Sequence, residues 1–519
     1  MPRIFYTHFA FFIFITLWME NQWPSILLLL AQIVLIPVLF LVIVDEESSF
    51  KKAYPFFALP AYASLAWMSI FPSNWNGLLS VIYLLFTVYI ALFGIRRFLH
   101  RGFIQVEEFV IDCGFIFLSV GGIWFLAYEM GIDTGFSPLI TWLTAIHFHY
   151  SAFLMLVFIG LLGRLKKGVL YPYMASSMIL LPWVMAVGIS LSPWVELIGI
   201  IVYILSVFSI IIYSFRLAYV NRLQKTLVIT SFASVGVTII FAYLYIISHS
   251  FQYGIVTIEW MLIFHGITNA LLFGLIGSVG WLLAIPSSKW EAPNFPLSLI
   301  RGKYRPSKEA IPLRGLVDDM TIYAPFIKEE RVSQTVIDFY ENTLDYQLHA
   351  RVHWHTWFKP FAFVYRGISR LLEQINLPLS SKAIRMTGDI YRVEGDGRGD
   401  VRAWMRKIGE ETVFVALYSF HEKEGRTYMN IALPFPFTSM HGILALNEHG
   451  KDLELTSERK NSTMKDAGIY LAFGKNIRFR LPLSENFYVQ EIKKGKLQAS
   501  HRMRILGIPF LTIHYDITK

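Results

Sequence analysis

The sequence has 519 residues, of which 55% are hydrophobic, 16% are aromatic and 16% are charged. An ordinary soluble domain is about 25% charged, so this composition excludes a wholly soluble chain. The first 288 residues contain 12 of the 46 basic and 11 of the 37 acidic residues, so most of the net charge of +9 falls in the remainder. The sequence therefore indicates a membrane protein with a basic soluble tail.

Ten segments are apolar enough to cross a bilayer, whose hydrocarbon core requires roughly 20 residues of helix. They are residues 4–19, 24–44, 54–71, 77–95, 109–129, 138–163, 171–191, 194–214, 227–247 and 257–285. The first is short, but no small-residue cleavage site follows it, so we interpret it as an uncleaved helix. The expected fold begins with a polytopic α-helical membrane domain of about ten transmembrane helices, at 1–286.

Basic residues occur in alternate connections between these segments. They are Arg3, Lys51, Lys52, Arg96, Arg97, Arg101, Arg164, Lys166, Lys167, Arg216, Arg222 and Lys225. The intervening connections have no Lys or Arg, and the positive-inside rule then predicts a multi-pass protein of the cell membrane with both termini cytoplasmic. The single cysteine, Cys113, lies in the fifth segment and excludes a disulfide within the chain.

Three histidines lie within apolar segments. His147 and His149 belong to the sixth segment, "TAIHFHYSAF", and His265 belongs to the tenth, in "FHGITNA". At 1.5 Å per residue, His147 and His265 are about 14 and 12 Å from the outer ends of their helices, so they lie at similar depth. Ionisable groups inside a membrane are costly and by default suggest a function.

Helical geometry limits what these histidines can do together. Residues two apart on an α-helix point roughly 200° apart, so His147 and His149 cannot bind one metal from a regular helix. At most one of them joins His265, and we expect His149 and His265 as the metal ligands if a metal is bound. Asn269 follows His265 by four residues and is expected to orient its imidazole.

Three interpretations of the histidines stay open. They could ligate a metal ion or haem, although no attachment motif for haem is present. They could form a substrate or proton path with Glu129, which ends the fifth segment near Asp133, Glu196 and Glu259 at the outer surface. They could also be purely structural, each satisfied by Thr141, Thr144, Tyr150 or a backbone group.

A Pro-, Ser- and Lys-containing linker at 287–316 follows, and we expect it to lie along anionic lipids of the inner leaflet. From 317 to 376 the pattern is mainly helical, with Ser333 as an N-cap. An amphipathic run at 357–376 places five apolar residues on one stripe: Phe361, Val364, Ile368, Leu371 and Ile375. This helix either packs on its own domain or lies flat in the membrane interface.

From about 382 the residues alternate as in antiparallel strands, so the tail at 317–519 is expected to be a soluble α+β domain with a curved antiparallel sheet. The glycines of "EGDGRGD" (Gly395, Gly397 and Gly399) are interpreted as a hairpin turn and not as a phosphate loop. His353 and His355, in "RVHWHTW", share a face of a strand, but no third ligand accompanies them.

On "HFHY" and "HGITNA", the chain resembles the YndJ family of Bacillus-type multipass membrane proteins. The resemblance implies that His147, His149, His265, Gly266 and Asn269 match the family motif, and it implies a transporter-like protein without a defined substrate. The tail resembles a bacterial domain of unknown function in which a Trp-x-Arg turn, here Trp404 and Arg406, precedes the strands.

The function expected from these features is a transporter or permease with a polar site at His147, His149 and His265 and a tail that binds an amphiphilic ligand. The alternatives are a membrane-embedded metal-dependent enzyme and a membrane sensor with a cytoplasmic output domain. The absence of a nucleophile–base motif such as GxSxG disfavours an enzyme. The basic excess borders a membrane, so it gives no support to nucleic-acid binding.

Overall fold

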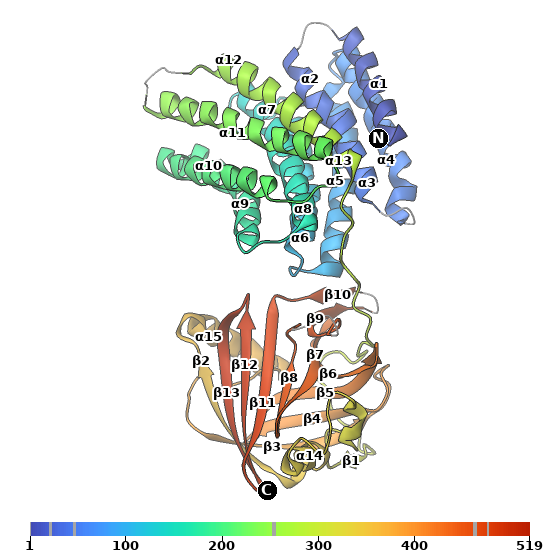
Figure 1. Cartoon of the computed structure of the whole chain (residues 1–519), viewed down its shortest axis with the longest axis vertical. Coiled ribbons are helices and arrows are strands. Elements are labelled where there is room, and N and C mark those ends of the chain that lie inside the picture. Colours follow the sequence, from blue (N-terminus) through green and yellow to red (C-terminus); the bar gives the residue numbers. More distant parts are fainter. Residues whose placement is uncertain (1, 20–22, 45–47, 252–255, 460–463, 475–476) are drawn as a thin grey trace. The chain divides into compact units, whose positions relative to one another are not determined.

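The computed structural model describes the chain except for residues 1, 20–22, 45–47, 252–255, 460–463 and 475–476. The chain forms two compact units (Figure 1). The helical unit comprises Met1–Phe98 and Gln105–Trp290, and the barrel unit comprises Leu99–Ile104 and Glu291–Lys519. The unit boundary therefore divides the expected linker, because Phe295 and Leu297 are buried within the barrel unit.

Helices make up the first unit, and several contain π-helical segments, which are labelled η1 to η4. In chain order they are α1 (Arg3–Trp18), α2 (Trp23–Leu30), η1 (Ala31–Leu35), α3 (Ile36–Ile43), α4 (Ser49–Ile70), α5 (Asn76–Arg101), α6 (Val106–Glu129), α7 (Pro138–His147), η2 (Phe148–Leu154), α8 (Met155–Leu165), α9 (Tyr171–Leu191), α10 (Pro193–Phe215), α11 (Arg222–Phe251), α12 (Ile258–Trp260), η3 (Met261–Ile267), η4 (Asn269–Ile276) and α13 (Gly277–Leu283).

The multipass prediction is confirmed. In the described part of the chain, eight helices are long and apolar enough to cross a membrane: Trp23–Ile43, Asn76–Arg101, Val106–Glu129, Pro138–Leu165, Tyr171–Leu191, Pro193–Phe215, Arg222–Ser248 and Ile258–Leu283. The other two expected spans are helices as well. Of these, α1 is short, and α4 contains Lys51, Lys52 and two prolines.

Helix α6 packs closely against its neighbours through glycines. A Cβ atom at Gly114 would lie 3.2 Å from the carbonyl oxygen of Phe153, and Gly122 faces the side chain of Thr87. Gly160 of α8 likewise faces Ile111. Small residues of this kind let helices approach within a membrane, where packing replaces the hydrophobic effect as the driving force. Helix α6 thereby becomes the element against which α7, η2, α8 and α9 pack.

The barrel unit contains thirteen described strands. They are β1 (Pro312–Leu313), β2 (Gln347–Trp354), β3 (Ile384–Val393), β4 (Val401–Ile408), β5 (Glu411–Lys423), β6 (Arg426–Pro434), β7 (Thr438–His449), β8 (Asp452–Thr456), β9 (Gly468–Phe473), β10 (Ile477–Arg480), β11 (Leu483–Lys493), β12 (Lys496–Ile505) and β13 (Ile508–Thr518). Helices α14 (Gln334–Glu341) and α15 (Lys359–Leu372) and the short 3-10 segments η5 (Met320–Tyr323), η6 (Thr343–Asp345) and η7 (Thr356–Phe358) accompany them.

Ten of these strands close into an antiparallel barrel. The order is β7-β6-β5-β4-β3-β2-β13-β12-β11-β8, and the pairing of β8 with β7 closes the ring. The expected antiparallel tail is confirmed, and its curved sheet closes into a barrel. Strand β7 pairs with β9 through its first half, up to Ile443, and with β8 from Ala445 onward.

The two ends of the barrel differ. Because neighbouring strands are antiparallel, the β4–β5, β6–β7 and β12–β13 turns lie at the end where β2 stops and α15 follows, which we call the α15 end. Helix α14 lies at the other end, where the Ser333 side chain accepts a hydrogen bond from the Thr335 backbone, as the N-cap prediction requires. Gly395 and Gly397 lie in the β3–β4 turn with positive φ, which confirms the turn prediction.

Candidate functional site

Four polar residues of the helical unit lie in its π-helical segments. Gln32 lies in η1, His149 in η2, His265 in η3 and Asn269 in η4. Segments η1, η2 and η4 contact one another, so three of these deviations meet inside the bundle. A π-helical turn adds one residue to the α-helical repeat and is frequent at functional sites. The period of the sequence does not reveal such insertions.

His149 is fully buried and both of its ring nitrogens have partners. Nδ1 lies 2.7 Å from the carbonyl oxygen of Ala145, so Nδ1 donates its proton there. Nε2 then accepts from the hydroxyl of Tyr83, at 2.7 Å. Tyr83 is also hydrogen-bonded to the buried side chain of Gln32. These contacts form a polar chain from α5 to η1 and η2.

His265 pairs with His147 and not with His149. The two rings are stacked with centroids 6.5 Å apart, His147 at the exposed surface of the helical unit and His265 half-buried. His147 donates from Nδ1 to the Leu143 carbonyl at 2.7 Å, and His265 donates to the Thr238 carbonyl at 3.0 Å. Among the described residues, no hydrogen-bond partner is found for the Nε2 atoms of these two rings.

The structure connects Asn269 to His265 through α11. The Thr238 hydroxyl donates to Asn269 Oδ1 at 2.9 Å, and the Thr238 carbonyl accepts from His265. The shared partner is thus Thr238, and the side chain of Asn269 reaches the imidazole only through it. Glu129 ends α6 beside Asn76, to which it is hydrogen-bonded, and no described contact joins it to the histidines.

The described contacts of the histidines do not test the hypothesis of a metal site or that of a substrate or proton path, so both stay predictions. A metal bound by His149 would have to displace Tyr83 from Nε2, and no described contact joins His149 to His265. Among the described residues, the group of metal-ligating side chains that converges is Asp319, Glu329 and Glu341 of the barrel unit. It is partly exposed and contains none of the histidines of the helical unit, so it supports neither prediction.

Gly121 offers a direct test of the buried polar chain. A Cβ atom there would lie 2.8 Å from Nδ1 of His149, whereas at Gly266 the nearest atom would be at an ordinary 3.4 Å. We expect Gly121→Ala to push His149 from Tyr83 and lower stability by about 1–3 kcal/mol. Gly266→Ala is the matched control and should be neutral or slightly stabilising. Equal thermal midpoints of the two full-length variants in detergent would contradict the expected packing.

A buried ionic cluster joins α5, α6 and α8, and the sequence analysis missed it. Glu108 accepts from Arg97 at 2.6 Å and from Arg164 at 2.7 and 2.8 Å, so it bridges two arginines. Arg97 also lies 3.0 Å from Asp112, and Arg164 donates to the carbonyl of Pro286. Charges buried this deeply are retained only when paired. The sequence does contain a signal for this cluster. Glu107 and Glu108 lie in the first turn of α6, the helix that follows Arg97 of α5 in the chain.

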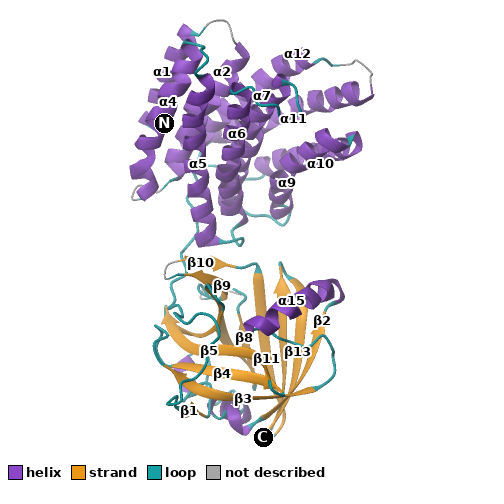
Figure 2. Ribbon diagram, turned by 180° about the vertical axis from the view of Figure 1, so that it is seen from behind, coloured by secondary structure: helices purple, strands orange, loops and turns teal. Residues whose placement is uncertain are grey.

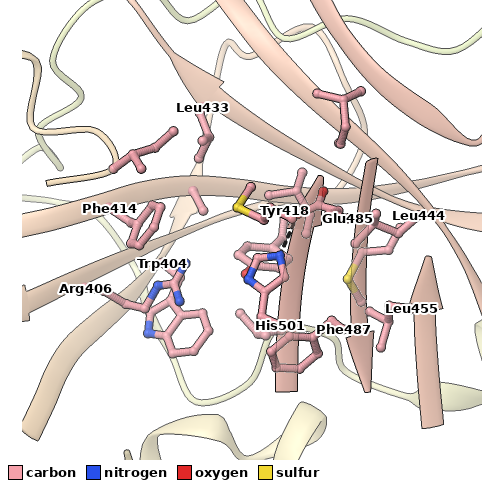
Figure 3. Close-up of a pocket in the computed structure, with 18 of the residues that line it drawn as sticks. Trp404, Arg406, Phe414, Tyr418, Leu433, Leu444, Leu455, Glu485, Phe487 and His501 are labelled. Carbon is pink, nitrogen blue, oxygen red and sulfur yellow. Dashed lines mark hydrogen bonds and ion pairs between the residues drawn. The ribbon is translucent and has the colours of Figure 1, made fainter. Parts of the chain in front are cut away.

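The interior of the barrel contains a cavity of about 120 Å³ (Figure 3). Its walls are mainly apolar, and its two ends differ. Phe339 and Tyr340 of α14 line it at one end, and Met503 and Phe510 line it towards the α15 end. The polar groups that line it are few, which is the usual constitution of a small-molecule site.

Arg406 brings a positive charge into this cavity. Its guanidinium carbon lies 4.7 Å from the ring centre of Trp404 and 4.3 Å from that of Phe414, and Tyr515 is hydrogen-bonded to it. No carboxylate among the described residues pairs with this guanidinium, and its Nε is buried without a hydrogen-bond partner. Burial raises the pKa of Tyr418 to about 12, so this neighbouring hydroxyl also stays protonated.

A second polar pair faces the cavity from β11 and β12. His501 Nε2 lies 2.8 Å from Glu485 Oε2, and Figure 3 shows the pair beside Tyr418. Gly442 of β7 makes room for it, since a Cβ atom there would lie 2.5 Å from Glu485 Oε1. The carboxylate of Glu485 is thus already paired with the imidazole of His501.

Trp404 and Arg406 do not form a turn: both lie in β4, where residues two apart share a face and point together into the barrel. His353 and His355 do lie close together, with ring centroids 5.1 Å apart, and His355 also contacts Thr512. No third ligand joins them among the described residues.

The fold and these sites define a membrane protein with a polytopic helical unit and a ligand-sized cavity in a closed β-barrel. The chain belongs to the YndJ-like protein family, whose sequence model matches residues 26–273. It is 36% identical over 460 residues to a protein of Bacillus subtilis (strain 168) named uncharacterized membrane protein YndJ, covering 85% of this chain and 84% of that protein. No solved structure gives a significant match to the chain.

Proposed function

We propose that this protein is a transporter-like membrane protein whose barrel binds a single-chain amphiphilic anion. The observation that carries the proposal is the apolar barrel cavity with one guanidinium, that of Arg406, that has no carboxylate partner among the described residues. A helical unit that crosses the bilayer gives such a ligand a route, and the barrel gives it a binding site outside the hydrocarbon.

The charge supports an anionic head group. An unpaired charge in a mainly apolar site is costly unless a counter-charge binds it, and a guanidinium binds carboxylate or phosphate through parallel hydrogen bonds. Tyr515 already contacts Arg406, and Tyr418 lies close enough to interact with its charge. Glu485 is engaged with His501 and does not take this place.

The size supports a single apolar chain. The cavity of about 120 Å³ is smaller than the roughly 150 Å³ that holds one benzene molecule in an engineered protein core, so a longer chain requires the wall side chains to move. Two acyl chains of a phospholipid would not enter. Met429, Met440 and Met503 line the cavity, and methionine side chains adapt to a longer chain more readily than branched ones.

The helical unit supports a second, related role as the path itself. The coincidence of buried polar residues with π-helical segments favours a substrate or proton path through His147, His149 and His265, with Asn269 and Glu129 as further members. In this proposal the barrel faces the cytoplasm, as the distribution of basic residues predicts for both termini, and the segment after the last helix contacts anionic lipids of the inner leaflet of the cell membrane.

Dodecanoic acid labelled with ¹³C at its carboxyl carbon tests the binding proposal. We expect full-length protein in lipid nanodiscs to give a bound carboxyl resonance distinct from that of bilayer-dissolved acid. Ala416 is buried and lines the cavity, so Ala416→Trp should abolish the bound signal by filling it. Thr387→Trp, on the exposed face of β3, is the control and should keep it. A bound signal that persists in Ala416→Trp would refute the cavity as the site.

A further inference from the structure

Helix α15 lies on the outside of the barrel (Figure 2), and its apolar stripe is exposed. Phe361, Phe363, Val364, Ile368 and Leu371 are between 51% and 71% exposed. At 100° per residue, all of them except Phe363 fall within roughly 80° of one another, so they form one continuous face. A surface helix normally turns such a stripe towards the core of its own domain. The packing of α15 on its own domain, one of the two expectations from the sequence, is therefore not made through this stripe.

The side of α15 that meets the barrel unit is made of small and polar residues. Ala362 and Ser369 are the buried residues of the helix, and the Ser369 hydroxyl donates to the carbonyl of Arg366. Tyr365 is half-buried and donates to the carbonyl of Gln374. The buried side of the helix is thus formed by small residues, and the large apolar side chains lie outside.

Further exposed apolar side chains lie at the same end of the barrel. Leu506 and Ile508 are exposed at the β12–β13 turn, and Trp357 donates from Nε1 to the carbonyl of Pro509 at 2.9 Å, which ties this turn to the segment preceding α15. Phe437, in the β6–β7 turn of the α15 end, is 90% exposed. Apolar groups gathered in this way mark an interaction surface.

We propose that α15 and the β12–β13 turn form a membrane-docking surface that inserts into the interface of an anionic phospholipid bilayer. The face of α15 roughly opposite the stripe is basic: Lys359 and Arg370 are exposed, and Arg366 is half-buried. An apolar helical face opposite a basic one is the pattern of helices that lie in the bilayer interface of anionic membranes. A protein partner would leave this basic face without a specific role.

The chain keeps this surface near a bilayer. The last candidate span ends at Leu283, and Phe295 is already buried in the barrel unit. Eleven residues lie between them, and even a fully extended chain over these twelve residue steps spans only about 40 Å. Tethering at this distance makes docking an intramolecular event with a high effective concentration of lipid. Docking would place the α15 end of the cavity at the lipid surface, and it does not depend on what the cavity binds.

Depth-dependent quenching of site-specific labels tests the surface. Single cysteines at Val364→Cys and Ile368→Cys, in a Cys113→Ala background, would carry an environment-sensitive fluorophore in the full-length protein reconstituted into vesicles containing phosphatidylglycerol and brominated lipid. Lys494→Cys, at the exposed β11–β12 turn of the opposite end, is the matched control. We expect about threefold more quenching at positions 364 and 368 than at 494, as for side chains buried in the interface.

Three outcomes would overturn the proposal. Quenching at 364 and 368 equal to that at 494 would mean that the stripe stays in water. Energy transfer between labels on two copies, without lipid quenching, would mean that a second chain covers the stripe. Undiminished quenching after phosphatidylglycerol is replaced by phosphatidylcholine would exclude a role for the basic face. An Arg366→Gln, Arg370→Gln double variant should lose quenching only in the anionic vesicles.

Discussion

Replacing Glu108 by glutamine is expected to destabilise the helical unit by about 3–5 kcal/mol, the cost of leaving buried charges without their partner. Glu108 is fully buried and bridges Arg97 and Arg164, so the variant leaves two guanidinium groups facing a neutral amide. The measurement is the thermal midpoint and the monodisperse yield of the full-length protein in detergent. A loss of this size is a large share of the stability of a typical domain.

The neighbouring Glu107→Gln variant is a matched control. Glu107 pairs with Lys167, whose side chain is 48% exposed, so this interaction is screened and should contribute within about 1 kcal/mol. A Glu108→Gln, Arg164→Gln double variant should recover part of the loss, because removing both partners leaves fewer unpaired charges. Equal stability of the two single variants would contradict the importance of the cluster.

The second large effect concerns the head group of the cavity ligand. Arg406→Gln is expected to weaken binding of dodecanoate by about 10- to 150-fold, since hydrogen bonds to charged groups contribute about 1.5–3 kcal/mol. The same substitution should leave the affinity for dodecanol nearly unchanged, because the alcohol has no charge for the guanidinium to bind. The ratio of the two affinities, measured on full-length protein in nanodiscs, isolates the charge from the apolar contact.

Arg385→Gln provides the control for net charge, because Arg385 is exposed on β3. It should alter neither affinity. A loss of dodecanoate and dodecanol binding together in Arg406→Gln would show that Arg406 supports the cavity wall through Trp404 and Phe414 and does not recognise the head group.

Hydropathy was sufficient to predict the membrane class and the helices, because a bilayer-spanning helix must be long and apolar whatever its neighbours are. The alternation of strand residues likewise predicted the antiparallel tail. Closure of the barrel depends on the pairing of β8 with β7 and with β11, and on that of β2 with β13. The last pair is separated by more than 150 residues, so no local pattern reveals it.

The histidines illustrate what sequence periodicity leaves undetermined. Their similar depth suggested that they meet, and His147 and His265 do. The structure places His149 with Tyr83 because η2 carries a π-helical turn and α5 brings a tyrosine to the same level, and neither feature has a signature in the spacing. In the sequence, Arg97 and Arg164 indicate only the orientation of the helices, yet in the structure they bind Glu108 inside the bundle.

In the tail, the sequence patterns were visible, and what they left open was the direction in which the side chains point. The apolar stripe of α15 was evident from its spacing, but whether it faced the barrel or the solvent depended on which other residues could pack. Ala362 and Ser369 fill that role because they are small. Trp404 and Arg406 were noted as a motif, and their two-residue spacing, typical of one strand face, was the signal that both enter the barrel.

The central claim, that the barrel holds a single-chain amphiphilic anion, is tested most directly by native mass spectrometry of the full-length protein released from its own membranes. We expect one bound acid per chain in the wild type, its mass depleted in Arg406→Gln and absent in Ala416→Trp. Wild-type protein that carries no such adduct, or that carries only two-chain phospholipids retained equally by both variants, would contradict the claim.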